Sequence, residues 1–514
     1  MKLRLKGRII KSGLRLHKRL TTQSRKKPIV LQEKALKNLL KKAADTDFGK
    51  NYGFEEILKE DNFIKAFQER VPIHDYDKIY NEWWHRLLDE EEDVVWPGKI
   101  RYFALSSGTS GSPSKYIPVS DQMQKAMSRA SKFMFSHSIK LGLPPAFYGR
   151  HFLMMGSSTE FTHKGDLLIG DVSGINSSNV PFWFRSFYRP GRKIKKIKDW
   201  KSRIEAIAEK AKDWDICTIS GIPSWVQLMM ERVIEHNGVQ NIHEIWPNFQ
   251  VYVSGGIAFG PYKKRFEQLC GKPIMTLDTY YTSEGCIACQ TRLDNEEMPM
   301  ELILKNGIFF EFIPFDDAHF KNGLMIEGAK ALTVEEIEEG VDYALVISSC
   351  SGAWRYLIGD TLKFTNKDTA EIKITGRTKH FLSITGEHLS VDNMNKGIEA
   401  MEELLDIVIP EFSVKGIKVD NHFEHHWYIG CDSDFDEQNF AQKLDAKLSE
   451  LNDDYATERK ENLLRYIKVH RLEEKTFFDW LESMGKVGGQ SKFPRVMNDV
   501  QFENWKSFIK NYGK

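Results

Sequence analysis

Hydroxyls, glycines and a lysine are concentrated in one short run of the sequence, Ser106-Ser107-Gly108-Thr109-Ser110-Gly111-Ser112-Pro113-Ser114-Lys115. Such a loop can turn several backbone N–H groups toward one anion, while the hydroxyls add donors and the lysine adds a positive charge. It is not the Walker loop, because Gly108 and Gly111 are too close and Lys115 does not follow a glycine. The run therefore indicates a di- or triphosphate site, with a flexible Ser/Gly linker as the alternative.

Two acidic residues stand near the ends of strand-like runs. Glu284 belongs to Thr279-Tyr280-Tyr281-Thr282-Ser283-Glu284-Gly285, which follows an apolar run. At the carboxyl end of a parallel strand it can hold Mg²⁺, whose oxygen ligands include phosphates. Asp360 ends Arg355-Tyr356-Leu357-Ile358-Gly359-Asp360, and its two oxygens suit the paired hydroxyls of a ribose. Taken singly, each motif is more typical of a surface glutamate or of a Gly-Asp turn.

A second basic candidate is Arg377, which follows Gly376 at an expected domain boundary. A guanidinium placed there can clamp a ribose or a phosphate and move with a hinge.

The elements that must position these residues alternate between strands and helices. Residues 199–211 carry apolar side chains at helical spacing, and Ser224 with Gln227 has the pattern of a capping box that starts the next helix, which we expect to end near Gly238. Strands are expected at residues 100–105, 216–219, 250–254, 274–277, 343–348 and 371–375. Strands separated by helices predict an α/β fold with a parallel sheet covered on both faces.

A second, smaller domain is predicted after residue 375. Gly376 and Gly386 bracket a predicted hinge segment, and the remaining chain mixes a helix at 391–405 with strands near 412–419 and 465–472. We therefore expect an N-terminal domain at 1–375 and a C-terminal α+β domain at 376–514, joined by a hinge at 376–386.

The composition excludes several classes of protein. The chain has 514 residues, 41% hydrophobic and 28% charged, which is typical of a globular protein with more than one domain. Its 73 basic and 72 acidic residues create no overall field for nucleic acid. Six cysteines and no signal-peptide pattern favour a cytoplasmic protein with reduced thiols, and no apolar run is long enough for a transmembrane segment.

The first 27 residues form a basic amphipathic stretch with no acidic residue. It can dock on an anionic membrane surface, or it can form a helix that lies on the protein's own body with its charges solvated. The second interpretation is favoured, because charge runs are usually solvated faces.

Taken together and in order, these motifs resemble the signature of the adenylate-forming superfamily, which includes acyl-CoA synthetases, luciferases and peptide-synthetase adenylation domains. The sequence is most similar to the auxin-responsive acyl-acid amido synthetase family, best known from plants and also found in bacteria. The similar segments extend over nearly the whole chain: residues 44–50, 106–118, 254–256, 281–285, 355–360 and 489–495.

The resemblance implies a large N-terminal domain with mostly parallel sheets, a small mobile C-terminal domain, and a two-step reaction. ATP with Mg²⁺ would activate a carboxylic acid as an acyl-adenylate, and the amine of an amino acid would then take the acyl group. For this reaction the protein would mainly have to position the reactants and offset the negative charge on the phosphates.

The resemblance also implies a role for each motif. The β- and γ-phosphates would be held by Ser106, Ser107, Gly108, Thr109, Ser110 and Lys115. The adenine and α-phosphate would be bordered by Tyr281, Thr282 and Ser283 on one side and by Gly255 and Gly256 on the other. Glu284 would ligate Mg²⁺, and Asp360, supported by Arg377, would bind the ribose. Lys492 would enter from the C-terminal domain, which makes Lys115, Glu284 and Lys492 the expected catalytic residues.

One departure from the family concerns His388, which stands where plant members usually have a lysine; a histidine carries only partial charge at neutral pH. The acyl pocket is expected within residues 147–225, where Arg185 either pairs with the substrate carboxylate or belongs to a packed aromatic helix face. Cys286 and Cys289 lack the further ligands of a zinc site. Residues 422–426 are expected in a surface turn before a strand.

Two other functions remain open at this point. An acyl-CoA ligase of the same superfamily would use a thiol in place of the amine. A non-catalytic nucleotide-binding or membrane-docking protein would use the basic amino-terminal stretch as its working part. The acid, the amine and the oligomeric state are not specified by the sequence.

Overall fold

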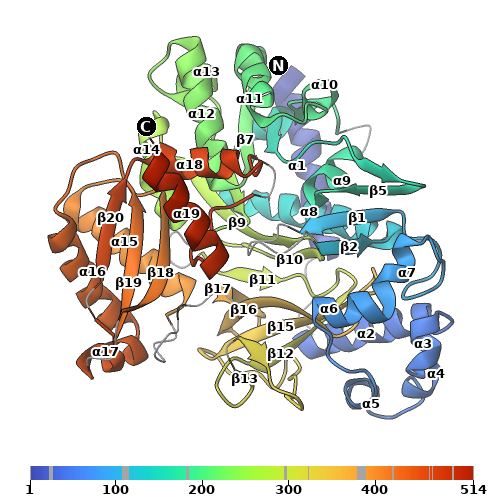
Figure 1. The fold of residues 1–514 in the computed structure, drawn as a ribbon. Helices are drawn as coiled ribbons and strands as arrows, with labels where there is room; N and C mark the ends of the chain where they lie inside the picture. Colours follow the sequence, from blue (N-terminus) through green and yellow to red (C-terminus); the bar gives the residue numbers. More distant parts are fainter. Residues whose placement is uncertain are drawn as a thin grey trace.

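The computed structural model describes residues 2–21, 27–106, 115–180, 184–293, 298–321, 323–378, 382, 389–419, 422–461, 464–465, 467–488 and 491–512. Its largest element is an eleven-stranded mixed sheet. Figure 1 shows this sheet running through the centre of the molecule, with helices packed around it.

One half of the large sheet is parallel. In spatial order it contains β6 (Tyr188–Arg189), β3 (His151–Met155), β7 (Ile216–Gly221), β8 (Val251–Gly255) and β9 (Met275–Thr282). This confirms the parallel arrangement expected from alternating strands and helices. However, β9 extends to Thr282, so the Thr279–Thr282 part of the glutamate motif lies on the strand itself.

The other half of the large sheet is antiparallel. It continues with β10 (Gly285–Cys289), β11 (Met300–Leu302), β17 (Glu371–Arg377), β16 (Tyr356–Asn366), β15 (Asp342–Ser349) and β12 (Ile308–Pro314). Only Ser283 and Glu284 separate β9 from β10, and so short a connection requires the strand to reverse direction. Asp360 lies within β16 and not in a turn.

Helices cover the parallel half as expected. The predicted helix at 199–211 is α11 (Trp200–Lys210), capped by the Asp199 side chain, and it packs against α12 (Pro223–Asn237). The predicted capping box of α12 is wrong: Pro223 stands at the first helical position, and no side chain caps the helix. Proline suits this position because its φ is already helical and its missing N–H is not needed. The helix ends at Gly238, which adopts φ +63°.

A second sheet of four strands lies beside the first. Its order is β2 (Lys115–Val119), β1 (Tyr102–Ser106), β5 (Leu167–Gly170) and β4 (Thr162–Lys164). β1 and β2 are antiparallel, which places Ser106 opposite Lys115. The two ends of the predicted phosphate loop are therefore adjacent. α9 (Val172–Ser178) packs on β1 of this sheet, while α8 (Asp121–His137) packs on α9 and on β10 of the large sheet.

The C-terminal part builds a three-stranded sheet of β18 (Glu411–Val419), β19 (His422–Gly430) and β20 (Lys468–Leu472). It packs with α15 (Val391–Leu405), α16 (Glu437–Leu451) and α17 (Asp453–Lys460) around its own core. The predicted helix at 391–405 is confirmed. The predicted surface turn at 422–426 is wrong, because these residues begin β19 and His425 is fully buried.

The last two helices join the core of the large domain. α18 (Glu474–Ser483) and α19 (Asp499–Asn511) contribute Trp480 and Trp505 to a cluster that also contains Trp200 of α11 and Trp225 of α12. In Figure 1 these two helices, in red, lie between the orange C-terminal sheet and the green helices of the parallel half.

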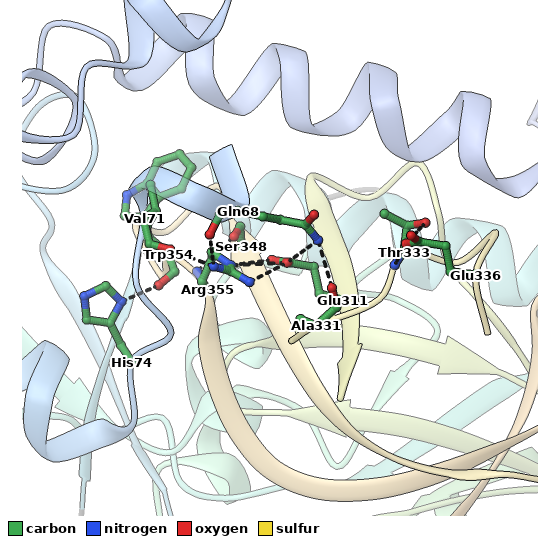
Figure 2. Close-up of polar contacts among 10 residues, drawn as sticks. All are labelled: Gln68, Val71, His74, Glu311, Ala331, Thr333, Glu336, Ser348, Trp354 and Arg355. Carbon is green, nitrogen blue, oxygen red and sulfur yellow. Dashed lines mark hydrogen bonds and ion pairs between the residues drawn. The ribbon is translucent and has the colours of Figure 1, made fainter. Parts of the chain in front are cut away.

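A buried ion pair anchors the start of β16. The Arg355 Nε atom lies 3.1 Å from both carboxylate oxygens of Glu311, and both side chains are buried. Figure 2 shows this pair with its neighbours: the Arg355 Nη1 atom also donates to the Gln68 and Val71 carbonyls at 2.6 and 2.7 Å. Arg355 adopts φ +43°, which a non-glycine residue holds only when its surroundings fix it. Arg355 of the Asp360 motif therefore has a structural role.

His74 extends this network. It is buried, and its Nδ1 atom lies 2.9 Å from the Trp354 carbonyl oxygen (Figure 2). Burial lowers the pKa of His74 to about 4, so the ring is neutral at neutral pH and Nδ1 carries the proton that it donates. Within the described ranges, none of the helices is long and apolar enough to cross a membrane.

Candidate active site

One continuous cavity of about 2880 Å³ contains the predicted site residues that the structure describes. They come from both sheets and from the C-terminal part, and they line the cavity together: Ser106, Lys115, Gly255, Gly256, Tyr281, Thr282, Ser283, Glu284, Asp360, Arg377 and Lys492. Ser107, Gly108, Thr109, Ser110 and the divergent His388 lie outside the described residues.

Asp360 and Arg377 form the most ordered part of the cavity wall. They are direct cross-strand partners on β16 and β17, and the Arg377 Nε atom lies 2.9 Å from the Asp360 Oδ1 atom. The hydroxyl of Tyr280 donates to Asp360 Oδ2 at 2.7 Å. The Asp360 carboxylate raises the pKa of Arg377. The ion pair and the hydrogen bond together hold the carboxylate in one orientation.

Glu284 is buried at the turn between β9 and β10. Burial raises the pKa of its carboxyl, and the nearby Asp360 carboxylate acts in the same direction, while Arg377 opposes them. A desolvated carboxylate in this position gains from a cation. Its chemistry therefore fits the binding of a hard divalent ion that shares oxygen ligands with a phosphate.

Lys492 reaches the same cavity from the C-terminal part. Its Nζ atom donates to the Gly256 carbonyl at the end of β8. Loss of hydration and the neighbouring Arg377 lower the pKa of Lys492 to about 8. The backbone before it is held by Trp225 of α12, whose Nε1 atom donates to the Ser491 carbonyl at 2.9 Å.

The glycines after β8 are required by close packing. A Cβ atom on Gly255 would lie 2.7 Å from the Thr279 hydroxyl, and Gly256 adopts φ +89°, which favours glycine. These two residues form a flat floor of backbone between β9 and Lys492.

The predicted phosphate-binding end of the cavity includes the last residue of β1, Ser106, and the first residue of β2, Lys115. The Lys115 Nζ atom lies 5.0 Å from the centroid of the Tyr76 ring, a favourable cation–π distance. The hydroxyl of Tyr76 accepts a hydrogen bond from the Tyr116 backbone N–H at 2.9 Å. A helical turn that precedes both sheets thus positions Lys115.

The opposite end of the cavity is mainly apolar. Its wall comes from α8, β3 and the segments near them: Met127, Met134, Phe135, Phe147, Phe152, Phe184 and Tyr188. Tyr281 lies at the junction with the polar end, where its hydroxyl is hydrogen-bonded to the Asn176 side chain. Arg185 is exposed and donates to the Val180 carbonyl at 3.1 Å, so it lies away from this wall.

Several lining residues were not predicted from the sequence. Tyr280 and Asn176 act through side-chain contacts between distant segments, for which the sequence holds no local signal. Asp278 is half-buried, and its loss of hydration raises the pKa of its carboxyl to about 7; the available signal was its position two residues before Tyr280. The cysteines at 286 and 289 are buried, and among the described residues no cluster of three metal-ligating side chains occurs.

The fold described above is similar to that of known structures. The fold is similar to the GH3.15 acyl acid amido synthetase, with a TM-score of 0.78 at 16% identity over 97% of this chain and 96% of that one. It is also similar to a 2-hydroxyisobutyryl-CoA ligase in the postadenylation state, with a TM-score of 0.57 at 13% identity over 94% and 92% of the two chains. The fold is therefore that of the adenylate-forming enzymes, as the motifs predicted.

The sequence comparisons give the family. The GH3 family N-terminal, central and C-terminal domain models match residues 18–208, 301–377 and 392–501. The chain belongs to the GH3 family, which confirms the family resemblance of the motifs. One relative, the jasmonoyl–L-amino acid synthetase JAR6 of Nicotiana attenuata, is 22% identical over 91% of this chain and 90% of its own. Another, the indole-3-acetic acid-amido synthetase GH3.8 of Oryza sativa subsp. indica, is 28% identical over 73% and 70%.

Proposed function

We propose that this protein is an ATP-dependent acyl-acid amido synthetase. In the first step, a carboxylate oxygen of the acid attacks the α-phosphorus of ATP, the bond to the β-phosphate oxygen breaks, and pyrophosphate leaves. In the second step, the amine of an amino acid attacks the acyl carbon, the bond to the adenylate oxygen breaks, and AMP leaves as the nitrogen loses a proton. Adenylation is needed because a free carboxylate is a poor electrophile.

One observation carries this proposal. Lys492, from a segment more than a hundred residues beyond Asp360 and Arg377, enters the cavity that these residues line with Glu284. A single cavity thus combines a cation, an ordered carboxylate, a buried carboxylate and an apolar pocket. These are the groups that an acyl-adenylate with its departing pyrophosphate requires.

The geometry supports a role for each residue. Asp360, oriented by Arg377 and Tyr280, would accept hydrogen bonds from the ribose hydroxyls. Tyr281, Thr282 and Ser283 would border the nucleotide, with Gly255 and Gly256 on its other side. Ser106 and Lys115, with Ser107, Gly108, Thr109 and Ser110 between them, would hold the β- and γ-phosphates. Lys492 would offset negative charge on the reacting phosphate.

Glu284 would hold the magnesium ion. When bound, Mg²⁺ neutralises phosphate charge and keeps the polyphosphate in one geometry. The burial that raises the pKa of Glu284 supports this role, since a bound cation would keep the carboxylate ionised.

The acid is proposed to be hydrophobic. Methionine and aromatic side chains form the wall at the apolar end of the cavity. In addition, relatives are named for the conjugation of jasmonic acid and of indole-3-acetic acid. The acceptor is proposed to be an amino acid. Residues 376–514 would act as the lid over the nucleotide site in 1–375, turning about a hinge at 376–386.

The test is acid-dependent pyrophosphate release from ATP, screened over aryl, indole and aliphatic acids, with amino acids or with CoA. We expect release that requires an acid and Mg²⁺ and rises with an amino acid, with the amide detected by mass spectrometry. Release stimulated only by CoA would identify an acyl-CoA ligase. ATP binding without release for any acid would reject the catalytic proposal.

A further inference from the structure

The first helix is held on the protein body by one face. In α1 (Lys2–Thr21), a Cβ atom on Gly7 would lie 1.8 Å from the Pro145 carbonyl oxygen, so this close approach requires glycine. Ile10 and Leu14 pack on the apolar cluster around Phe147 and Phe152. The Lys11 Nζ atom donates to the Leu143 carbonyl at 2.5 Å. The interpretation of this stretch as a helix lying on the protein's own body is therefore correct for this face.

The opposite face of α1 exposes an aliphatic stripe. Leu5, Ile9 and Leu16 are 61%, 67% and 60% exposed. Their spacing of four and then seven residues places them along one side of the helix. Gly7 and Leu14, which face the body, lie on the other side. Three large aliphatic side chains in a row are thus presented to water by a helix that already has a complete packing face.

Positive charge borders this stripe. Arg4, Arg8 and Arg15 are exposed next to it, and α1 holds eight Lys and Arg residues with no acidic residue. The Lys6 Nζ atom lies 3.9 Å from the centroid of the Phe187 ring, which places the start of α1 beside Phe187. The segment that contains Phe187, residues 185–198, adds the exposed Arg185, Arg192 and Lys193 and has no acidic residue.

We propose that α1 docks this protein on the surface of an anionic lipid bilayer. Leu5, Ile9 and Leu16 would enter the boundary between head groups and acyl chains, while the arginines beside them would contact lipid phosphates. An apolar stripe between cations is the pattern of a helix that lies in the plane of a membrane interface. Each basic side chain near an anionic surface adds attraction, and the absence of acidic residues on α1 leaves nothing to oppose it.

In the sequence, α1 is also largely separate from the regions that the GH3 domain models match. The GH3 N-terminal domain model begins at residue 18, so most of α1 lies before it. The stripe is therefore not explained by the proposed reaction.

Its position nevertheless relates the membrane surface to the reaction cavity. α1 packs on α8 and on residues 147–149, and both contribute to the apolar wall of that cavity. A small apolar cavity of about 220 Å³ lies beside α1. Its lining includes Ile9 of the stripe as well as Phe135 and Phe184, which also line the large cavity. A docked molecule would hold its apolar pocket one layer of side chains from the helix that contacts the lipid.

The test is flotation of the full chain with vesicles of phosphatidylcholine alone or mixed with phosphatidylserine. We expect binding to the anionic vesicles only, weakened by added salt. Combining Leu5→Gln, Ile9→Gln and Leu16→Gln should weaken binding at least about tenfold, because the aliphatic insertion is lost. Combining Arg4→Gln, Arg8→Gln and Arg15→Gln should do the same and reduce the salt dependence.

A matched control removes three charges elsewhere. Lys418→Gln, Lys460→Gln and Lys510→Gln change exposed lysines of the C-terminal part by the same total charge, and this variant should bind as the unaltered protein does. All variants should keep their thermal unfolding temperature and their pyrophosphate release without vesicles. Absence of vesicle binding, including the case of binding to nucleic acid or an acidic protein instead, would overturn the proposal. The proposal would also be overturned if the control variant lost vesicle binding to the same extent, or if neither α1 variant lost any.

Discussion

The Arg377 Nε atom lies 2.9 Å from the Asp360 Oδ1 atom across the antiparallel pair β16–β17. Arg377 is the last residue of β17 and lies at the start of the segment 376–386 proposed as the hinge. The orientation of the proposed ribose ligand is thus fixed by a residue at the boundary of the proposed lid. Nucleotide binding and lid position are expected to depend on each other through this contact.

Removing the charge of Asp360 should weaken ATP binding. Asp360→Asn loses the ion pair with Arg377 and the charged acceptor for the ribose. Because both interactions are lost, KM for ATP should rise by about 10-fold or more. Pyrophosphate release measured against ATP concentration checks this. Asp342→Asn is the control, because Asp342 pairs with Lys363 at 3.6 Å on the neighbouring strand outside the cavity. Equal effects of the two changes would contradict the ribose role.

Lys492 should act on rate more than on binding. Lys492→Ala removes a positive charge that meets the reacting phosphate, so kcat for adenylation should fall by roughly 10²–10³-fold with a smaller change in KM. Single-turnover formation of acyl-adenylate measures this directly. Lys486→Ala, six residues earlier, serves as the control. A change confined to KM would assign Lys492 to ground-state binding alone.

The pH dependence should carry the signature of the same lysine. Its pKa is lowered to about 8, so its charged form is lost as pH rises through that value. The kcat/KM of adenylation should therefore decline above about pH 8. Lys492→Arg keeps its charge at all these pH values and should extend the activity to higher pH, even if its maximum is lower. An identical alkaline limb in both proteins would exclude Lys492 as its origin.

A half-buried carboxyl between α12 and α18, that of Glu474, should make stability depend on pH. The Gln227 Nε2 atom donates to Glu474 at 2.7 Å, and burial, followed by the nearby Glu231, raises the pKa of Glu474 to about 8. In the unfolded chain the pKa of this carboxyl is near its ordinary value of 4.5. Below that pH the carboxyl is protonated in both the folded and the unfolded states, so its burial does not lower the free energy of unfolding. Between about pH 4.5 and pH 8 the carboxyl is ionised in the unfolded state but still protonated in the folded state, so the free energy of unfolding falls as pH rises.

Glu474→Gln should remove this dependence. The variant should unfold at a higher temperature than the unaltered protein at pH 8, with a smaller difference near pH 5. Glu473→Gln, an exposed neighbour, is the matched control. Thermal unfolding followed by circular dichroism gives both values, and parallel pH profiles for the two variants would refute the assignment.

The buried pair in Figure 2 should dominate the stability of the β12–β15–β16 region. Arg355→Ala leaves the Glu311 charge buried without its partner, and about 3–5 kcal/mol of unfolding free energy should be lost. Denaturant unfolding measures the loss. Arg232→Ala removes an exposed arginine that pairs with Glu205 and Glu235, and should change stability little. Similar effects of the two changes would show that burial is not decisive.

The candidate site residues could be located from the sequence where they adjoin strands. Glu284 lies in the turn between β9 and β10, and Lys115 is the first residue of β2, so strand-like apolar runs locate both. The helix at 391–405 was also predictable, because its periodicity and its capping residue Ser390 are local features.

Features that depend on distant contacts were not predictable. The start of α12 is decided by Pro223, while Gln227 turns to Glu474, almost 250 residues away. His425 is buried because β18 and β20 flank its strand on both sides, which a short polar run does not indicate. The apolar residues of α8 that line the cavity have the same sequence spacing as residues of a helix face that packs in the core. These outcomes follow from tertiary packing, which overrides local preference.

The hydrogen bond from Trp225 to the Ser491 carbonyl has an optical consequence. Any opening of the proposed lid must break this contact and admit water to an indole ring that is now almost fully covered. Trp200, whose ring centroid lies 5.3 Å from that of Trp225, would share the change. The protein therefore contains a built-in fluorophore at the place where its two parts meet, and a red shift of its emission during turnover would record each opening without any attached label.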